Sequence, residues 1–215
     1  AAYDTLRCRK SGGTPVPGQP YTIDRSSNSR RKAVEEWLFG LDLVTPDLRE
    51  KIVTAWVSTW SSSPYAELAE MPYSPGAPHY RLEWHVNDVT RNGLDLARRA
   101  AADWGKPIDM NVLVPILILH DVDKPLMYVR QSADKVVYSK LYHELQHGVA
   151  GAMLLKELGF DHTIVSTVAL HAGNSPYHGR NHEAYVLHYA DYFATDHAIM
   201  QEPGEQEPYY QKHWR

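Results

Sequence analysis

A series of histidines and aspartates in this chain has the residue types that bind divalent metal ions. Its centre is an adjacent pair, His120-Asp121, at the close of an apolar stretch that begins at Val112. The other members are His85, His147, His171 and Asp191. Imidazole and carboxylate together suit a hard-to-borderline ion such as Fe, Mn or Zn. Such an ion lowers the pKa of bound water toward neutrality or holds a substrate oxygen, so the series predicts a metalloenzyme.

Helical spacing turns these side chains toward the interior. On one expected helix Leu113, Leu117 and His120 stand at positions i, i+4 and i+7, and Asp121 follows at i+8. Burial of a carboxylate costs several kcal/mol unless a positive group accompanies it, and a bound cation would supply that charge. A hydrogen-bonded core histidine or a helix-capping aspartate explains any single member of the series. It does not explain four or more members on separate apolar faces.

The elements that must hold these residues are helices. Apolar periodicity, N-capping residues and helix-ending glycines predict helices over residues 30–43, 46–61, 78–104, 109–123, 140–158, 161–172 and 181–200. One small β-hairpin over residues 127–130 and 136–139 is also compatible with the pattern. The predicted fold class is therefore all-α, a helical bundle with an extended N-terminal arm.

The chain divides into four segments by composition. Residues 1–28 are rich in Gly, Pro, Ser and Arg and are expected to form the extended arm. Residues 29–77 carry accessory helices and a Pro-rich loop. Residues 78–200 form the metal-binding helical domain, and residues 201–215 form a polar C-terminal tail.

Composition narrows the class of protein. The 215 residues suffice for a domain with a sizeable core, and a net charge of -4 with interspersed signs gives no basic stripe for nucleic acid. Cys8 stands alone, which excludes an intramolecular disulfide and a cysteine-based zinc finger. The longest apolar stretch, Val112–Leu119, is too short to span a membrane. We therefore expect a small-molecule substrate and neither a nucleic-acid nor a membrane partner.

Location and assembly are less constrained by the sequence. No signal peptide is visible, so we expect a cytoplasmic protein, although a start at Ala1 without Met is also consistent with a cleaved signal peptide. The accessory helices carry Trp37, Trp56 and Trp60. These tryptophans either cap the bundle or form the contact of a homodimer.

The order of the histidines and aspartates resembles a known family. His85, then His120-Asp121, then Asp191 is similar to the H…HD…D signature of the HD-domain superfamily of metal-dependent phosphohydrolases. Lys124, three residues after the central aspartate, also matches, and the resemblance extends from about residue 80 to residue 200. It implies an HD-domain-like helical bundle in which these residues bind metal.

His147 and His171 resemble the two additional histidines of binuclear HD proteins. Those members include cyclic-dinucleotide phosphodiesterases and mixed-valence diiron oxygenases. The resemblance implies that Asp121 bridges two metals and that His147 and His171 hold one of them. The ligands implied for the other are His85, His120 and Asp191.

Two alternatives to this ligand set remain open. The site is mononuclear if the extra histidines only line the pocket, and His143, four residues before His147, is a rival for the same role. The expected cofactor is one or two divalent transition metals. Fe or Mn is favoured, with Zn, Co or Ni as further choices.

The resemblance implies a hydrolase in which Asp121 and Lys124 are catalytic. Metal-activated water would attack a small phosphoester-like substrate while Lys124 offsets the developing negative charge. The alternative is a diiron oxygenase that cleaves a C–C or C–P bond, and a less favoured one is a non-catalytic HD-like module. Asp123 departs from the family, because binuclear members often have Gly there, and it is expected to pair with Lys124.

The predicted substrate-binding residues are Tyr80, Trp84, Lys124 and Asn174. Their aromatic rings indicate a small, aromatic substrate. The cationic side chains of this region are scattered, so the sequence does not support specificity for a nucleotide polyphosphate or a cyclic dinucleotide.

Overall fold

The computed structural model describes residues 18–105, 107–172 and 181–204. Asn174, predicted to bind substrate, lies outside these described residues, as does the C-terminal tail from residue 205. The helices are α1 (Asn28–Trp37), α2 (Pro46–Ser62), α3 (Leu82–Trp104), α4 (Met110–Leu119), α5 (Lys124–Met127), α6 (Lys140–Glu144), α7 (Val149–Glu157), α8 (His162–Leu170) and α9 (His182–Met200). The strands are β1 (Pro72–Ser74), β2 (Ala77–Arg81), β3 (Tyr128–Ser132) and β4 (Lys135–Tyr138), and two 3₁₀ turns span Leu41–Leu43 and Leu68–Glu70. The predicted helical fold class is confirmed.

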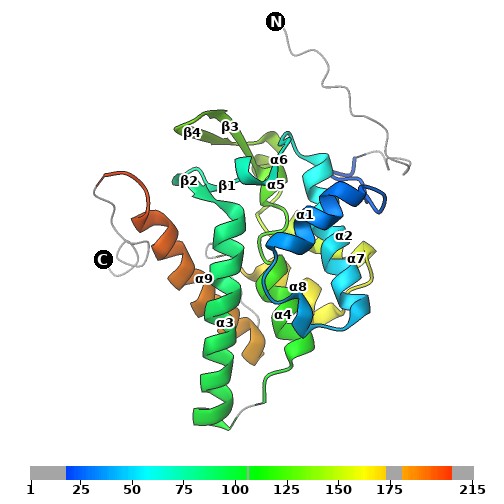
Figure 1. Ribbon diagram of the computed structural model, residues 1–215, viewed down its shortest axis with the longest axis vertical. Coiled ribbons are helices and arrows are strands. Elements are labelled where there is room, and N and C mark those ends of the chain that lie inside the picture. The colour runs from blue at the N-terminus through cyan, green and yellow to red at the C-terminus, as the bar shows by residue number, and fades with distance from the viewer. Residues whose placement is uncertain (1–17, 106, 173–180, 205–215) are drawn as a thin grey trace, which may run out of the picture.

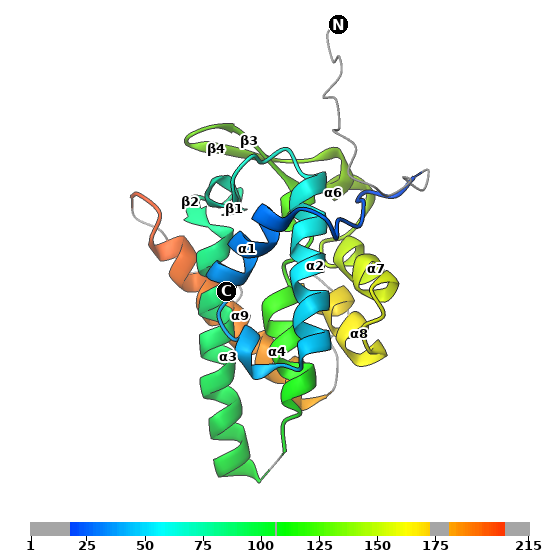
Figure 2. The ribbon, with the colours of Figure 1, turned by 45° about the vertical axis from the view of Figure 1, so that its right-hand side comes forward.

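Helix α4 lies at the centre of the bundle. It contacts α2, α3, α8 and α9, and every residue from Leu113 to Leu119 is buried. Helices α3 and α9 pack along each other, and both hairpins lie at one end of the bundle (Figure 1). A turned view shows the same end carrying the hairpins, with α7 and α8 on the opposite flank from α3 (Figure 2). None of the helices in the described ranges is long and apolar enough to cross a membrane.

The predicted helix over residues 46–61 is confirmed, and its start follows from the sequence. The Thr45 hydroxyl accepts from the backbone N–H of Leu48, and Pro46 occupies the first turn, where its missing N–H costs nothing. The middle of α2 is buried on all sides, and the Trp56 indole donates to the carbonyl of Ile118 at 3.2 Å. Trp56 also meets Trp37 edge to face at 5.1 Å. Trp56 and Trp60 are therefore buried within this chain, which favours the capping role for the accessory helices.

The segment before α1 is tied to α2 through one buried carboxylate. Asp24 is 2% exposed and accepts hydrogen bonds from Ser26, Ser27 and Ser61. Burial alone would raise its pKa, but these donors hold the pKa of Asp24 at about 2. Tyr21, three residues earlier, is also buried. Residues 18–27 thus pack against the accessory helices.

The predicted helix over residues 78–104 starts late, at Leu82. Residues 77–81 instead form strand β2, which pairs antiparallel with β1 in a register of Pro72 with Arg81 and Ser74 with Ala77. The predicted helix began at Pro78, a residue type that the first turn of a helix tolerates. A proline fits the edge of a short hairpin equally well, since no ladder hydrogen bond is needed from its nitrogen there. The predicted hairpin over residues 127–139 is confirmed as β3 and β4.

The predicted single helix over residues 140–158 is wrong. Helix α6 ends at Glu144, Leu145 is extended, and α7 begins only at Val149. Gly148 has φ +92°, a left-handed conformation that favours glycine, and a Cβ there would lie 2.5 Å from the carbonyl oxygen of Val168. The close approach of this segment to α8 breaks the helix, and the break carries His147.

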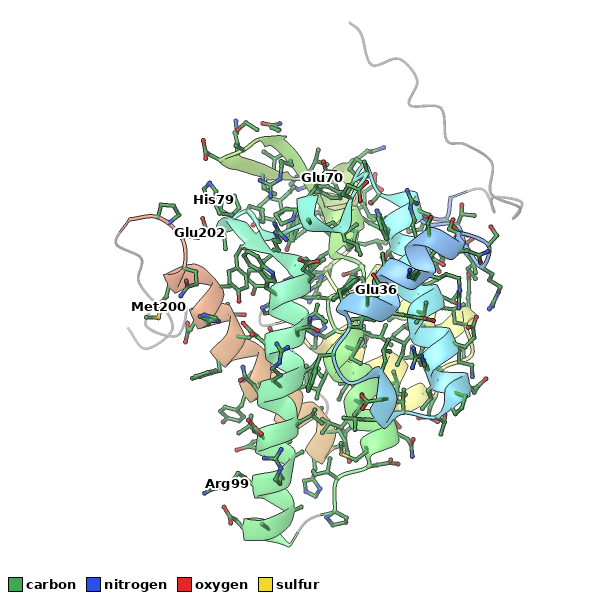
Figure 3. The ribbon with its side chains drawn as sticks, viewed as in Figure 1. Glu36, Glu70, His79, Arg99, Met200 and Glu202 are labelled. Carbon is green, nitrogen blue, oxygen red and sulfur yellow. The ribbon has the colours of Figure 1, made fainter. Side chains whose placement is uncertain are left out.

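The hairpins are held to the end of α9 by a buried glutamate. Glu202 accepts from the backbone N–H groups of His79 and Tyr80 and lies 2.7 Å from Nδ1 of His79 (Figure 3). Nε2 of His79 reaches Asp134 in the turn of β3 and β4 at 2.9 Å. One imidazole thus links α9 and both hairpins at the same end of the bundle.

Candidate metal centre

Four histidines and two aspartates converge at the hairpin end of α4, from five separate parts of the fold. They form two groups, in each of which three ligand atoms lie within 4.8 Å of one another. The first group is His85 on α3, His120 at the end of α4, and Asp191 on α9. The second is Asp121 after α4, His147 in the break before α7, and His171 at the end of α8. These are the six residues that the sequence predicted as ligands.

The first group is compact and buried. Nε2 of His85 lies 3.3 Å from Nε2 of His120 and 3.1 Å from Oδ1 of Asp191. His85 and His120 are fully buried. Two imidazole nitrogens and one carboxylate oxygen supply three donors, which is three of the four positions of a tetrahedral site or three of the six of an octahedral one.

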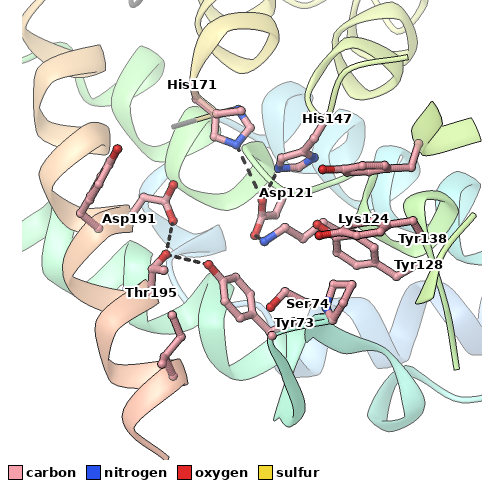
Figure 4. Close-up of a pocket in the computed structure, with 16 residues that line it drawn as sticks. Tyr73, Ser74, Asp121, Lys124, Tyr128, Tyr138, His147, His171, Asp191 and Thr195 are labelled. Carbon is pink, nitrogen blue, oxygen red and sulfur yellow. Dashed lines mark hydrogen bonds and ion pairs between the residues drawn. The ribbon is translucent and has the colours of Figure 1, made fainter. Parts of the chain in front are cut away.

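The second group surrounds the other side of the central carboxylate. Oδ1 of Asp121 lies 2.9 Å from Nε2 of His147 and 3.7 Å from Nε2 of His171. Figure 4 shows both imidazoles directed at this aspartate. Oδ2 of the same carboxylate faces the first group, 3.3 Å from both His85 and His120. Asp121 therefore presents one oxygen to each group, as a bridging carboxylate does.

Hydrogen bonds fix the tautomers of three of the four imidazoles. Nδ1 of His120 donates to the carbonyl of Leu117 at 2.9 Å, and Nδ1 of His171 donates to that of Val168 at 2.7 Å. Nδ1 of His147 lies 2.7 Å from a carboxylate oxygen of Asp123. A neutral imidazole that donates through Nδ1 carries its lone pair on Nε2. Each of the three Nε2 atoms that faces Asp121 is thus set up as a metal ligand.

Unsatisfied polar atoms mark the same place. Oδ2 of Asp121 makes no hydrogen bond, although the ammonium of Lys124 lies 2.6 Å away, and Nδ1 of His85 is likewise without a hydrogen bond. The ammonium offsets the charge of the carboxylate, whereas the buried ring nitrogen of His85 has no hydrogen-bond partner among the described residues and is costly to leave in that state. The donor set of imidazole nitrogens and carboxylate oxygens fits one or two divalent transition-metal ions.

The charges of the centre shift its ionisation equilibria. Burial alone would raise the pKa of Asp121, but His120, Lys124 and His147 outweigh burial and hold that pKa well below its usual value. Burial alone would also raise the pKa of Asp191, but His85 and His120 outweigh burial and lower it. Burial lowers the pKa of His147, yet Asp123 and Asp121 raise it to about 9. An ion bound at Nε2 of His147 would therefore displace a proton.

The expected pairing of Asp123 with Lys124 is wrong. The buried carboxylate of Asp123 contacts His147 and the start of α7, whereas Lys124 pairs with Asp121. The ammonium of Lys124 also lies 3.8 Å from the centre of the Tyr73 ring. Lys124 is thus held at the centre itself and remains free of Asp123.

A cavity of about 430 Å³ opens over the second group and Asp191. Several aromatic rings line its walls, and Tyr138 and Tyr142 stack on each other at 4.0 Å between ring centroids. The tyrosines that line it are Tyr73, Tyr128, Tyr138, Tyr142 and Tyr192. Among the described residues that line this cavity, Lys124 is the one lysine or arginine. The cavity therefore offers aromatic surface and a single fixed cation beside the candidate ligands.

Tyr73 connects the cavity wall to the first group. Its hydroxyl lies 2.6 Å from the hydroxyl of Thr195, which donates to Oδ1 of Asp191 at 3.3 Å (Figure 4). Its ring packs against the imidazole of His85 at an interplanar angle of 32°, with centroids 3.9 Å apart. Neither Tyr73 nor Thr195 is among the four substrate-binding residues predicted from the sequence. The high content of tyrosine, fourteen residues, was the available signal for the cavity wall.

Three other predicted or rival residues lie elsewhere. Tyr80 is buried and donates to Asp88 at 2.6 Å, and Trp84 is 45% exposed beneath the guanidinium of Arg81. Neither is among the residues that line the cavity over the candidate ligands. His143 is exposed on α6 and belongs to neither ligand group. The break before α7 separates it from His147, which removes the shared helical face that made it a rival.

Comparison with known proteins agrees with the geometry. The HD domain family matches residues 90–196, a range that holds every candidate ligand except His85. A curated protein of Methanocaldococcus jannaschii, dihydroneopterin 2',3'-cyclic phosphate phosphodiesterase, is 28% identical over 118 residues. The matched region is 53% of this chain and 47% of that protein, so the chain spans about half the length of this relative. No solved structure matches at a significant level. The chain belongs to the HD-domain superfamily.

Proposed function

We propose that this chain is a metal-dependent phosphohydrolase that acts on a small phosphoester. The observation that carries the proposal is the carboxylate of Asp121, which presents one oxygen to each of two histidine groups at the floor of a cavity. Divalent ions held by the two groups would supply Lewis-acid activation of water and of a phosphoryl oxygen. The similarity to a phosphodiesterase supports hydrolysis over the oxygenase alternative.

Residues of the chain itself would bind and orient the substrate anion. Lys124 is buried, carries the cavity's fixed positive charge, and lies beside the carboxylate that the two groups share. An ammonium in this position offsets negative charge that develops on a phosphoryl group during attack by water. The ring of Tyr73 lies against Lys124 and His85 and so restricts where both can move. In this scheme Lys124 has the catalytic role and Tyr73 a positioning role.

The cavity supports a substrate with an aromatic ring and one phosphate. Its tyrosine-lined wall offers stacking surface, and a single ammonium matches one phosphate better than a polyphosphate. The relative's printed activity, on the cyclic phosphate of a pterin, combines these two features. We therefore propose aromatic phosphoesters, cyclic phosphodiesters among them, as the substrate class.

A hydrolysis assay by ³¹P NMR tests the proposal, because it follows both the ring-opened monoester formed from a cyclic phosphodiester and the inorganic phosphate released from a monoester. The metal-loaded chain is offered cyclic phosphodiesters and phosphomonoesters with and without an aromatic ring, under air and under nitrogen. We expect metal-dependent hydrolysis that favours the aromatic members and is equal in both atmospheres. Turnover that depends strictly on dioxygen, with two irons per chain, would establish the oxygenase instead. A carefully purified sample that binds no transition metal would indicate a non-catalytic module.

A further inference from the structure

Asp123 is a buried carboxylate at the centre that the ligand set does not use. It is fully buried and lies two residues after Asp121. It belongs to neither ligand group among the described residues. A buried carboxylate needs compensating contacts, so its partners show what it does.

Both oxygens of Asp123 are occupied, and by different partners. Oδ1 lies 2.7 Å from Nδ1 of His147. Oδ2 accepts from the backbone N–H groups of Gly148 at 2.8 Å and Gly151 at 3.2 Å. The carboxylate is therefore fixed at the first turn of α7 and cannot turn away from the imidazole.

The imidazole of His147 is held between two aspartates. Its Nδ1 faces Asp123, and its Nε2 lies 2.9 Å from Asp121. A carboxylate on Nδ1 fixes both the tautomer and the orientation of the ring and makes Nε2 a more basic ligand. His147 lies in the break between α6 and α7, where no helix of its own holds it. Asp123 thus supplies the orientation that regular secondary structure does not.

We propose that Asp123 is the positioning residue of the second metal-binding group and that the second ion depends on it. This inference rests on the metal centre of the proposed function. The contrasting role is purely structural, in which Asp123 only caps α7 through Gly148 and Gly151. A capping role predicts a loss of stability, whereas a positioning role predicts loss of one ion and retention of the other.

Mn²⁺ titration of the full chain separates the two roles. Binding is followed by isothermal titration calorimetry and by electron paramagnetic resonance, which distinguishes a spin-coupled pair of Mn²⁺ ions from an isolated ion. For Asp123→Ala we expect binding of the second ion to weaken about 10- to 100-fold, with loss of the coupled signal. Binding of the first ion, at His85, His120 and Asp191, is expected to keep the parent affinity.

Asp161→Ala is the matched control. Asp161 caps α8, which carries the other histidine of the second group at its far end, and accepts from the N–H of Thr163 at 2.8 Å. Its loss weakens a helix start without touching a candidate ligand, so both ions are expected to bind as in the parent. A selective effect of Asp123→Ala beside this control is what the inference requires.

A second variant covers the case in which Asp123→Ala does not fold. Asp123→Asn keeps the volume of the side chain, but its amide can accept from His147 or from the backbone of α7 and not from both. Asp123→Asn is expected to weaken binding of the second ion as well, by a smaller factor than Asp123→Ala. Unchanged binding of both ions in the folded variant overturns the inference while the hydrolase stands. A parent chain that binds one ion also overturns it, and a parent that binds none overturns the proposed function itself.

Discussion

Gly148→Ala tests how the break before α7 shapes the centre. Gly148 has φ +92°, and an alanine in this left-handed conformation costs about 1–2 kcal/mol. Its Cβ would also lie 2.5 Å from the carbonyl oxygen of Val168, which accepts the Nδ1 hydrogen bond of His171. Overpacking of this kind costs about 1–3 kcal/mol. We expect the free energy of unfolding to fall by about 2–5 kcal/mol, measured by urea denaturation.

Gly159→Ala separates backbone strain from the clash. Gly159 also has a positive φ, +73°, but a Cβ there meets nothing within 4 Å. Its substitution is expected to cost only the strain, about 1–2 kcal/mol, and to leave metal binding unchanged. Gly148→Ala should additionally weaken binding of the second ion, because His171 loses its fixed orientation. Equal unfolding midpoints and equal metal content for the two variants would refute the reasoning.

The remaining predictions concern the ligands, the cation and the N-terminal segment. His120→Ala is expected to reduce metal content, measured by elemental analysis, and to abolish hydrolysis; full metal content would contradict the role of His120. Lys124→Ala is expected to keep the metal and lower phosphoester turnover about 100-fold; loss of metal there would refute the role given to Lys124. The pKa of Asp24 is about 2 in the folded chain against 3.8 in the unfolded chain. Ionised Asp24 therefore stabilises the fold by about 2 kcal/mol above pH 4, and this stabilisation is lost as the pH falls toward 2. In Asp24→Asn this part of the acid dependence of urea unfolding should be absent, and an unchanged profile would contradict it.

Many of the helix starts were predictable because capping residues next to each start set its position. Thr45 with Pro46 starts α2, and Asp109, Asp161 and Asn181 accept from backbone N–H groups at the starts of α4, α8 and α9. Caps of this kind depend on residues within one turn of each other, so the sequence alone reveals them.

The missed elements depend on contacts between distant segments. The break at Gly148 follows from the approach of α7 to Val168 on α8, which no local pattern encodes. Strand β2 pairs locally with β1, but it is also held by Glu202 after α9, which accepts from the backbone N–H groups of His79 and Tyr80. Tertiary proximity decided both cases.

Part of the candidate site was likewise predictable from the sequence, and part was not. Its ligands were predictable from residue type, inward position and the family resemblance. The partner of Asp123 was not, because Asp123 and Lys124 are neighbours in sequence but their side chains point to different partners. The cavity wall combines tyrosines from β1, β3, β4, α6 and α9, and the predicted Tyr80 and Trp84, although close to His85 in sequence, are not among the residues that line it.

The most direct measurement is an anomalous difference map from a crystal of the chain loaded with Mn²⁺ or Fe²⁺. We expect two peaks, one on each side of the Asp121 carboxylate. One should lie among His85, His120 and Asp191, and the other between His147 and His171. A well-ordered crystal with no peak in reach of Asp121 would contradict the claim that these side chains form a metal centre.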